Sequence, residues 1–438
     1  MLLRAQVVGA CLAAVSVASC ATTDAVTNDR VNPERPIWYG RPSGSMHVVV
    51  HRAVTATSRQ VGEEYERGRP EIDARHNRVF VGSADRGLYA LRASDGSTIW
   101  RYETTGIVQS EPYYDEELDV VFFGSHDGAL YAVRAANGAL VFRFSSGAEV
   151  SKKPVRHGET LVFANAADYL FAIDRRTGKP RWQAHRTSAL GMEVAGYAGP
   201  AIDHRTGIVY TAFSDGNVAA YDVRDGSERW SPVDLAAEVE QSSGVGEAPR
   251  YLDVDTTPVI DTDEQGTAKV VFVASYAGGV YALDAVTGTR VWANDKAKGV
   301  TELLLFHEPA HAPSPGGPDN GVGPKIPARK ILVASSGTTG LWGLDTSSGR
   351  MLWRNPVPEG GITAPAVIAG ALMVGTTRYG VLLLSPINGR VIDGIDFGGA
   401  FSQSPAAYGL RAFIMNHQGT LLGIGLQPPT NVVVAPKD

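Results

Sequence analysis

The sequence predicts an all-β protein: an eight-bladed β-propeller of four-stranded antiparallel blades, with the ring closed by an N-terminal strand. Three observations support this prediction. A turn glycine recurs at intervals of 40 to 62 residues, a large aromatic residue follows it by four positions, and no segment shows helical periodicity. The turn glycines are Gly96, Gly138, Gly178, Gly226, Gly288, Gly349 and Gly389.

Each repeat carries strand and turn signals in the same order. A proline begins a short strand, because proline cannot donate to a β-ladder. A β-branched and aromatic run follows, as in residues 79–83, and then a second run, as in residues 88–91. In four copies an aspartate four residues before the glycine can bond the turn amides: Asp174, Asp222, Asp284 and Asp345. One such sheet cannot cover both of its own faces, so radial packing is expected.

The aromatic residue is Trp100, Phe142, Trp182, Trp230, Trp292 or Trp353, and only the last copy lacks it, with Asp393 there. We expect these rings to pack between adjacent sheets as framework. The last unit, roughly residues 404–426, lacks a fourth strand, whereas residues 46–54 alternate apolar and polar side chains outside any unit. We therefore expect residues 46–54 to close the ring, giving a propeller over residues 46–426 and a tail over 427–438. The long loops 231–252 and 308–329 have no assigned role.

The first 19 residues have the pattern of a secretory signal, with Arg4, an apolar run and the small residues Val17, Ala18 and Ser19. A cysteine directly after them, Cys20, resembles a bacterial lipobox; the alternative is an ordinary signal peptide with a chance cysteine. The resemblance implies acylation of Cys20, a tether over residues 20–45 and, with Ala21 next, a location at the periplasmic face of the outer membrane.

Composition excludes several kinds of site. The net charge of -6 does not build the basic field that nucleic acid needs, and we expect the lone lysine pair, Lys152-Lys153, to lie in a solvated turn. Both cysteines, Cys11 and Cys20, precede the body, which excludes disulfides and cysteine chemistry there. Residues 307–311 match His-Glu-x-x-His, but Pro309 is incompatible with the helix that a zinc protease needs. We expect no catalytic residues, no metal and no cofactor.

The repeat resembles that of quinoprotein-like propellers, which include pyrroloquinoline quinone dehydrogenases. Those enzymes are longer and typically carry an adjacent cysteine pair over the cofactor, which the body of this chain lacks. An enzyme or a ligand-binding sensor of the periplasm is the alternative function that this resemblance leaves open.

A narrower resemblance points to a scaffold. The segment Asp253–Pro258 is similar to an Asp-Val-Asp-Thr-Thr-Pro segment of the BamB family of outer-membrane β-barrel assembly lipoproteins, and residues 192–200 occupy the place of a second family loop. The resemblance implies that Asp253 and Asp255 accept charge-assisted bonds from a BamA-like partner, with Met192 and Val194 as apolar contacts. It also implies a non-catalytic role in which nascent outer-membrane proteins are further possible partners. Where the family typically has an arginine, this chain has Ala195.

Overall fold

The computed structural model describes residues 23–24, 43–55, 65–187, 198–235, 237, 253–310, 327–356, 360–396 and 398–427. Three of the predicted site residues, Cys20, Met192 and Val194, lie outside these ranges, as does His311. Within these ranges, no helix has the length and apolar character that crossing a bilayer requires.

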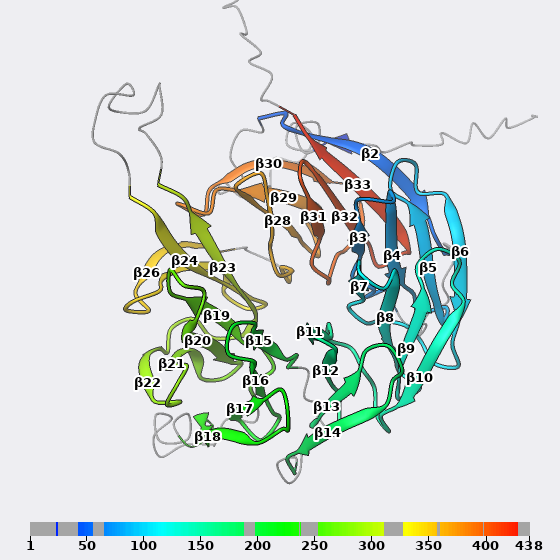
Figure 1. Ribbon diagram of the computed structural model, residues 1–438. Helices are drawn as coiled ribbons and strands as arrows, with labels where there is room; N and C mark the ends of the chain where they lie inside the picture. The colour runs from blue at the N-terminus through cyan, green and yellow to red at the C-terminus, as the bar shows by residue number, and fades with distance from the viewer. Residues whose placement is uncertain are drawn as a thin grey trace, which may run out of the picture.

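Eight antiparallel sheets form a ring in the described residues, which confirms the predicted eight-bladed propeller (Figure 1). Blade 1 consists of β3(Glu71–Asp73), β4(Arg78–Gly82), β5(Gly87–Arg92) and β6(Thr98–Glu103), and blade 2 of β7(Tyr113–Asp115), β8(Val120–Ser125), β9(Ala129–Arg134) and β10(Leu140–Ser145). Blade 3 consists of β11(Val155–His157), β12(Thr160–Ala164), β13(Tyr169–Asp174) and β14(Pro180–His185), and blade 4 of β15(Ala201–Asp203), β16(Ile208–Ala212), β17(Asn217–Asp222) and β18(Glu228–Asp234). Blade 5 consists of β19(Val259–Thr262), β20(Ala268–Ser275), β21(Gly279–Asp284) and β22(Arg290–Asn294). Blade 6 consists of β23(Val300–Glu308), β24(Arg329–Ser336), β25(Gly340–Asp345) and β26(Met351–Asn355). Blade 7 consists of β27(Ala366–Ile368), β28(Ala371–Gly375), β29(Val381–Leu384) and β30(Val391–Asp396). Blade 8 is β31(Ala406–Tyr408), β32(Arg411–Met415), β33(Thr420–Leu426) and the N-terminal β2(Met46–Ala53).

The two middle strands of each blade carry the core. In blade 1, β4 is buried throughout and β5 is buried up to its last residue, whereas the outer strand β6 alternates exposed and half-buried positions. Side chains of adjacent blades interdigitate, as where Phe80 and Leu88 of blade 1 share a cluster with Val121 and Phe123 of blade 2. Each blade therefore buries its faces only against its two neighbours, as in other repeat arrays.

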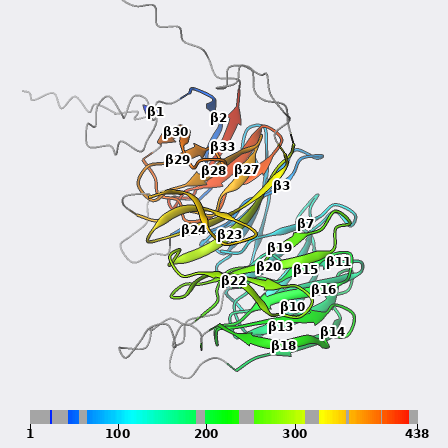
Figure 2. The ribbon, with the colours of Figure 1, turned by 90° about the vertical axis from the view of Figure 1, so that its left-hand side faces the viewer.

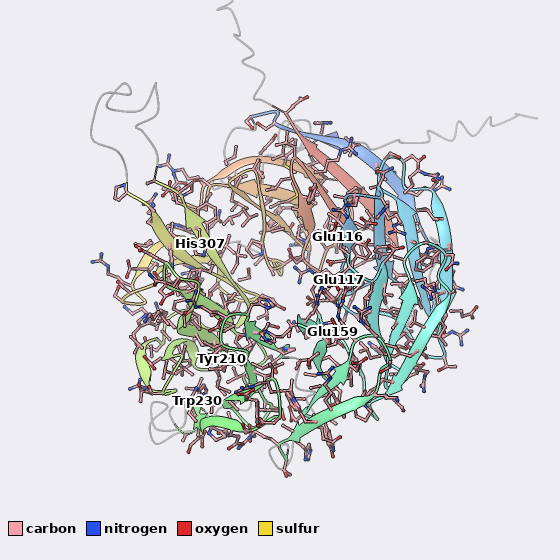
Figure 3. All side chains as sticks on the ribbon, viewed as in Figure 1. Glu116, Glu117, Glu159, Tyr210, Trp230 and His307 are labelled. Carbon is pink, nitrogen blue, oxygen red and sulfur yellow. The ribbon has the colours of Figure 1, made fainter. Side chains whose placement is uncertain are left out.

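The recurring aromatic ring lies across the glycine turn of the next blade. The indole nitrogen of Trp230 and the hydroxyl of Tyr210, both in blade 4, donate to the carbonyl oxygen of Ala285 at 3.3 and 3.1 Å (Figure 3). A Cβ on Gly288, whose φ is 74°, would lie 2.8 Å from the Trp230 ring. The turn therefore needs glycine both for its positive φ and for this close approach. The same contact joins Trp100 to Gly138, Phe142 to Gly178, Trp182 to Gly226, Trp292 to Gly349 and Trp353 to Gly389.

The ring closes in blade 8, beside the blade in which Asp393 replaces the recurring aromatic residue. Strand β2 pairs with β33 from Met46 opposite Leu426 to Ala53 opposite Thr420, which confirms closure by the N-terminal strand. Because the chain enters blade 8 at this strand, the blade has no turn between its third and outer strands for an aromatic ring to cover. Asp393 of blade 7 instead accepts the backbone N–H of Met46 at 2.8 Å, and it is itself buried. The missing aromatic therefore marks the seam of the ring.

A short strand from the predicted tether extends blade 7. Thr23 and Asp24 form β1(Thr23–Asp24), which pairs antiparallel with Asp396 and Ile395 at the outer edge of β30. Nearby, the N–H of Ser43 donates to the carbonyl of Ile392 at 3.0 Å. Thr23, Asp24 and Ser43 thus all bond the same strand, β30.

Truncation of one interblade ring tests this framework. Trp230 is 9% exposed, so Trp230→Ala should lower the free energy of unfolding by about 3–5 kcal/mol. The matched control Val286→Ala, at a side chain that is 70% exposed, should change it by less than about 0.5 kcal/mol. Denaturant unfolding of both variants measures the difference, and equal midpoints would contradict the framework role.

Candidate functional site: the lumen mouth

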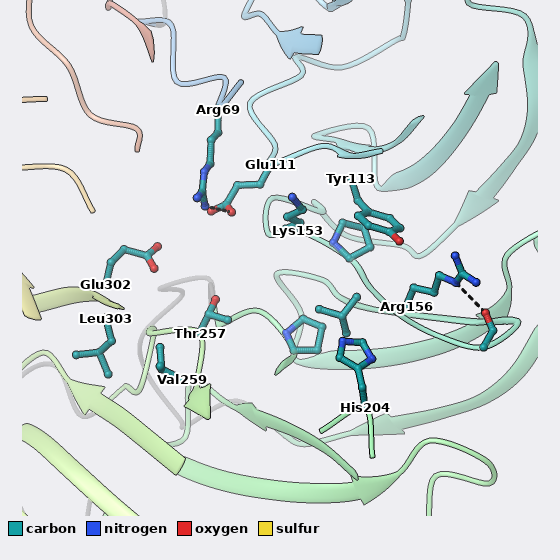
Figure 4. Close-up of a pocket in the computed structure, with 14 residues that line it drawn as sticks. Arg69, Glu111, Tyr113, Lys153, Arg156, His204, Thr257, Val259, Glu302 and Leu303 are labelled. Carbon is teal, nitrogen blue, oxygen red and sulfur yellow. Dashed lines mark hydrogen bonds and ion pairs between the residues drawn. The ribbon is translucent and has the colours of Figure 1, made fainter. Parts of the chain in front are cut away.

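The short inner strands of the blades surround a central lumen, and the loops that lead into these strands meet at one of its ends. We call this end the lumen mouth and define it by Arg69, Glu111, Lys152, Asp255 and Glu302, which line a cavity of about 610 Å³. A second cavity of about 650 Å³ lies beside it, and Arg69, Glu111 and Glu302 line both (Figure 4). The mouth therefore brings together side chains from blades 1, 2, 3, 5 and 6.

Four of these side chains form one chain of ion pairs, which we call the lumen strap: Arg69, Glu111, Lys152 and Glu302. The Arg69 guanidinium lies 2.5 Å from the Glu111 carboxylate, and the Lys152 ammonium lies 3.7 Å from the other oxygen of that carboxylate. Lys152 of blade 3 also donates a hydrogen bond to Glu302 of blade 6. Since these two blades are not neighbours, the strap crosses the lumen.

The strap is mostly buried and remains charged. The side chains of Glu111 and Lys152 are 12% and 17% exposed, so the expectation of a solvated turn at Lys152 is wrong. Burial disfavours the Glu111 carboxylate, but Arg69 and Lys152 outweigh burial and hold its pKa below the ordinary value. Burial likewise opposes the charge on Lys152, yet Glu302 and Glu111 raise its pKa above the ordinary value. Both shifts stabilise the charged strap near neutral pH.

The segment Asp253–Pro258 reaches the mouth from blade 5. Val254 is fully buried in the core between blades 4 and 5. The Thr256 hydroxyl accepts the N–H of Ala274 at 2.8 Å and donates to its carbonyl at 3.1 Å, which fixes the segment to β20. The Thr257 hydroxyl accepts the N–H of Gly199 at 3.0 Å and so joins the segment to the loop entering blade 4. The two threonines are thus structural, a role that the sequence motif did not reveal.

The two aspartates of this segment have different environments. Asp253 is 6% exposed, and its Oδ1 atom has no hydrogen-bond partner within the described ranges. Asp255 is half-buried and lines the lumen mouth together with Lys152 and Glu302. The structure therefore places one predicted partner-binding carboxylate at the mouth and the other beneath the surface next to it.

Two other clusters resemble chemical sites but are ion pairs. Asp73, His76 and Asp119 lie close enough to share a metal ion, but the Arg78 guanidinium contacts both carboxylates, at 2.6 and 2.5 Å. The side chain of Arg175 is fully buried and pairs with acidic residues of blades 2 and 3, namely Asp115, Glu117 and Glu159. An internal arginine thus pairs with the carboxylates of each cluster, and neither cluster was apparent from the sequence.

The His-Glu-x-x-His match does not form a helix. His307 and Glu308 end strand β23, and Glu308 pairs with Arg329 across the β23–β24 hairpin. The expectation that this segment lacks the helical geometry of a zinc protease is confirmed for its described residues.

Neutralising Glu111 tests whether the strap contributes to stability. A carboxylate whose pKa is lowered on folding stabilises the folded state above its ordinary pKa of 4.5 and loses this contribution as the pH falls through the folded-state pKa. Glu111→Gln should therefore cost about 1–3 kcal/mol near pH 7, and the difference from wild type should shrink below pH 4.5. Unfolding measured across pH, with the exposed Glu116→Gln as control, checks this prediction. A loss of stability independent of pH would contradict it.

Known proteins similar to this chain identify its family. The profile of the family described as outer membrane protein assembly factor BamB matches residues 53–122 and 117–322. The protein of that name from Legionella pneumophila is 24% identical over 215 residues, which cover 49% of this chain and 47% of the relative. The one from Yersinia pestis is 24% identical over 359 residues, which cover 80% of this chain and 70% of the relative. A tetrathionate hydrolase from Acidithiobacillus ferrooxidans is 23% identical over 78% of this chain and 56% of its own length. The chain thus spans about half the length of the first two BamB relatives that it matches.

Solved structures agree on the fold. BamB from Moraxella catarrhalis superposes with a TM-score of 0.64 at 18% identity, over 87% of this chain and 100% of the other. A quinohemoprotein alcohol dehydrogenase from Pseudomonas putida HK5 gives 0.61 at 15% identity, over 91% of this chain and 78% of the other. These two solved structures show only that the fold is a propeller. The family profile matches more than half of the chain and therefore shows the family. The chain belongs to the BamB family of PQQ-like-repeat β-propellers, as its motifs predicted.

Proposed function

We propose that this protein is an outer-membrane assembly factor that acts as a non-catalytic scaffold, presenting its lumen mouth to a BamA-like barrel-assembly protein. The observation that carries the proposal is the pair of carboxylates on one anchored segment: Asp255 at the mouth and Asp253 beside it, with a buried oxygen that lacks a hydrogen-bond partner within the described ranges. Asp255 lines the cavity at the mouth, so an arginine or lysine of a partner would form a favourable charge-assisted hydrogen bond there.

The described residues that follow the predicted apolar contacts lie beside the acidic segment. Met192 and Val194 lie outside the described residues, but the chain emerges from that loop at residues 198–200. There Gly199 is bonded to Thr257, two residues from Asp255. The end of the loop is therefore held against the acidic segment, which supports a shared docking surface formed by Met192, Val194, Asp253 and Asp255.

The ionisation of the strap supports a binding role rather than catalysis. A general acid or base works best with a pKa near the operating pH. In the strap, however, the pKa of Glu111 is shifted downwards and that of Lys152 upwards, both away from neutrality. Paired side chains of this kind hold loops in place and do not exchange protons readily.

A second candidate function has its own support. The similarity to a tetrathionate hydrolase and the cavity of about 650 Å³, lined by Tyr113 and His204 among others, favour a small-molecule enzyme or sensor. A cofactor absorbance in the purified protein, or tetrathionate turnover, would support this candidate over the scaffold.

The lipid anchor is a further part of the proposal. We assign residues 1–19 as the signal peptide, Cys20 as the acylated residue, and the segment up to residue 45 as the connection to the propeller. Cys20→Ala should move the protein from the outer-membrane fraction to the soluble periplasmic fraction, because two or more acyl chains supply the membrane affinity. Fractionation of cells expressing each form measures this, and an unchanged distribution would refute the anchor.

Charge reversal at the mouth tests the partner site. Asp255→Arg should reduce copurification of the BamA-like protein at least tenfold, because a cation would then face the cation of the partner. Asp225→Arg, at an exposed position on the turn of blade 4, serves as the control and should leave copurification unchanged. Thermal unfolding confirms that both variants fold. Full retention of the partner by Asp255→Arg would remove this site from the proposal.

A further inference from the structure

We propose that the outer rim of blades 5 to 7 lies against the phospholipid surface of the membrane, so that the lumen runs parallel to the bilayer. The proposed surface, which we call the rim patch, consists of Val286, Arg290, Val291, Arg350, Met351 and Leu352. The proposal rests on the lipid anchor at Cys20 and adds to it an orientation and a lipid-contacting surface.

The chain itself brings the anchor to this side of the ring. Strand β1 pairs with the outer edge of β30 in blade 7, as Figure 2 shows. Cys20 precedes Thr23 by three residues, and an extended chain spans at most about 3.6 Å per residue. The acylated residue is therefore held within about 11 Å of the outer edge of blade 7. Acyl chains that start there enter a bilayer that lies next to this edge.

The neighbouring outer strands offer apolar side chains to such a bilayer. In blade 5, Val291 is 54% exposed and Val286, on the turn before it, is 70% exposed. In blade 6, Met351 and Leu352 at the start of β26 are 49% and 42% exposed. Blades 5, 6 and 7 follow one another around the ring (Figure 1). These apolar side chains thus lie on the two blades that precede blade 7, where β1 pairs with β30.

The charges of the rim patch suit an anionic lipid surface. Arg290 and Arg350 are exposed directly beside the apolar residues. The acidic residues of the same turns face their own backbone: Asp284 accepts the N–H groups of Val286 and Thr287, and Asp345 accepts those of Ser347 and Ser348. Each turn therefore presents an exposed guanidinium, Arg290 or Arg350, beside its apolar residues, and such a group attracts an anionic phospholipid headgroup.

The shape of the ring restricts the contact to a few blades. A flat bilayer touches the rim of a round disc over only two or three neighbouring blades. The equivalent rim positions of blade 2, Leu140 and Val141, are also exposed, at 50% and 38%. Because blade 2 lies far from blade 6 around the ring (Figure 1), these residues cannot touch the same bilayer at the same time. They provide a control matched in chemistry and in position on the strand.

Site-specific spin labelling tests the orientation. The chain has no cysteine after Cys20, so a single cysteine introduced at Leu352 or at Leu140 can be labelled alone in the lipidated protein. In vesicles that contain phosphatidylglycerol, the label at Leu352→Cys should collide with oxygen at least threefold more, and with an aqueous nickel reagent at least threefold less, than the label at Leu140→Cys. Equal collision rates at the two sites would overturn the proposal, whether both labels are shielded from water or both are exposed to it.

A second comparison separates lipid contact from local folding. Val291→Cys reports on the patch from the neighbouring blade. When Val291→Cys is combined with Met351→Asp and Leu352→Asp, its spin label should become as accessible to the nickel reagent as the same label on protein without vesicles. Combined with Leu140→Asp and Val141→Asp, it should stay shielded. Shielding that survives the blade 6 changes would overturn the rim patch. Failure of Cys20→Ala to release the protein would instead refute the anchor, independently of these rates.

Discussion

The structure depends on the contact between an aromatic ring of one blade and the glycine turn of the next. This contact buries the ring, satisfies the indole N–H with a backbone carbonyl, and leaves no space for a side chain on the turn. Each blade is incomplete without it, since a single sheet covers neither of its own faces. Asp393 is the exception, because the outer strand of blade 8 is β2, which does not follow a glycine turn. The Asp393 carboxylate instead accepts the N–H of Met46, the first residue of β2.

A closed ring allows side chains from distant parts of the chain to meet at fixed distances. The lumen strap joins Arg69 to Glu302 through residues of blades 2 and 3, although 233 positions separate its ends in the sequence. Removing one partner of such an ion pair is costly, because it leaves the other charge largely buried and unpaired. The strap therefore fixes the relative positions of the loops that form the lumen mouth. A partner would meet a preformed surface there, which reduces the ordering cost of binding.

The sequence revealed what is periodic, and it was less informative about what is not. The spacing of the glycines and aromatics predicted the blades, and the unpaired strand at residues 46–54 predicted the closure. The strap could not be predicted, because its members share no motif and become neighbours only after the ring closes. Lys152 illustrates the difficulty: a lysine pair in a polar turn usually faces water, yet here the carboxylates of Glu302 and Glu111 offset the cost of burying the Lys152 ammonium. Asp253 and Asp255 were singled out by family resemblance, but only the structure shows that the threonines after them hold the segment in place.

Site-specific photocrosslinking in cells tests the central claim, that the lumen mouth is the docking surface, most directly. A photoreactive amino acid at Thr301, an exposed residue that lines the mouth, should crosslink to a BamA-like barrel-assembly protein identified by mass spectrometry. The same amino acid at the rim position Leu140 should give no such product. A crosslink to the barrel-assembly protein from Leu140 and none from Thr301 would contradict the account.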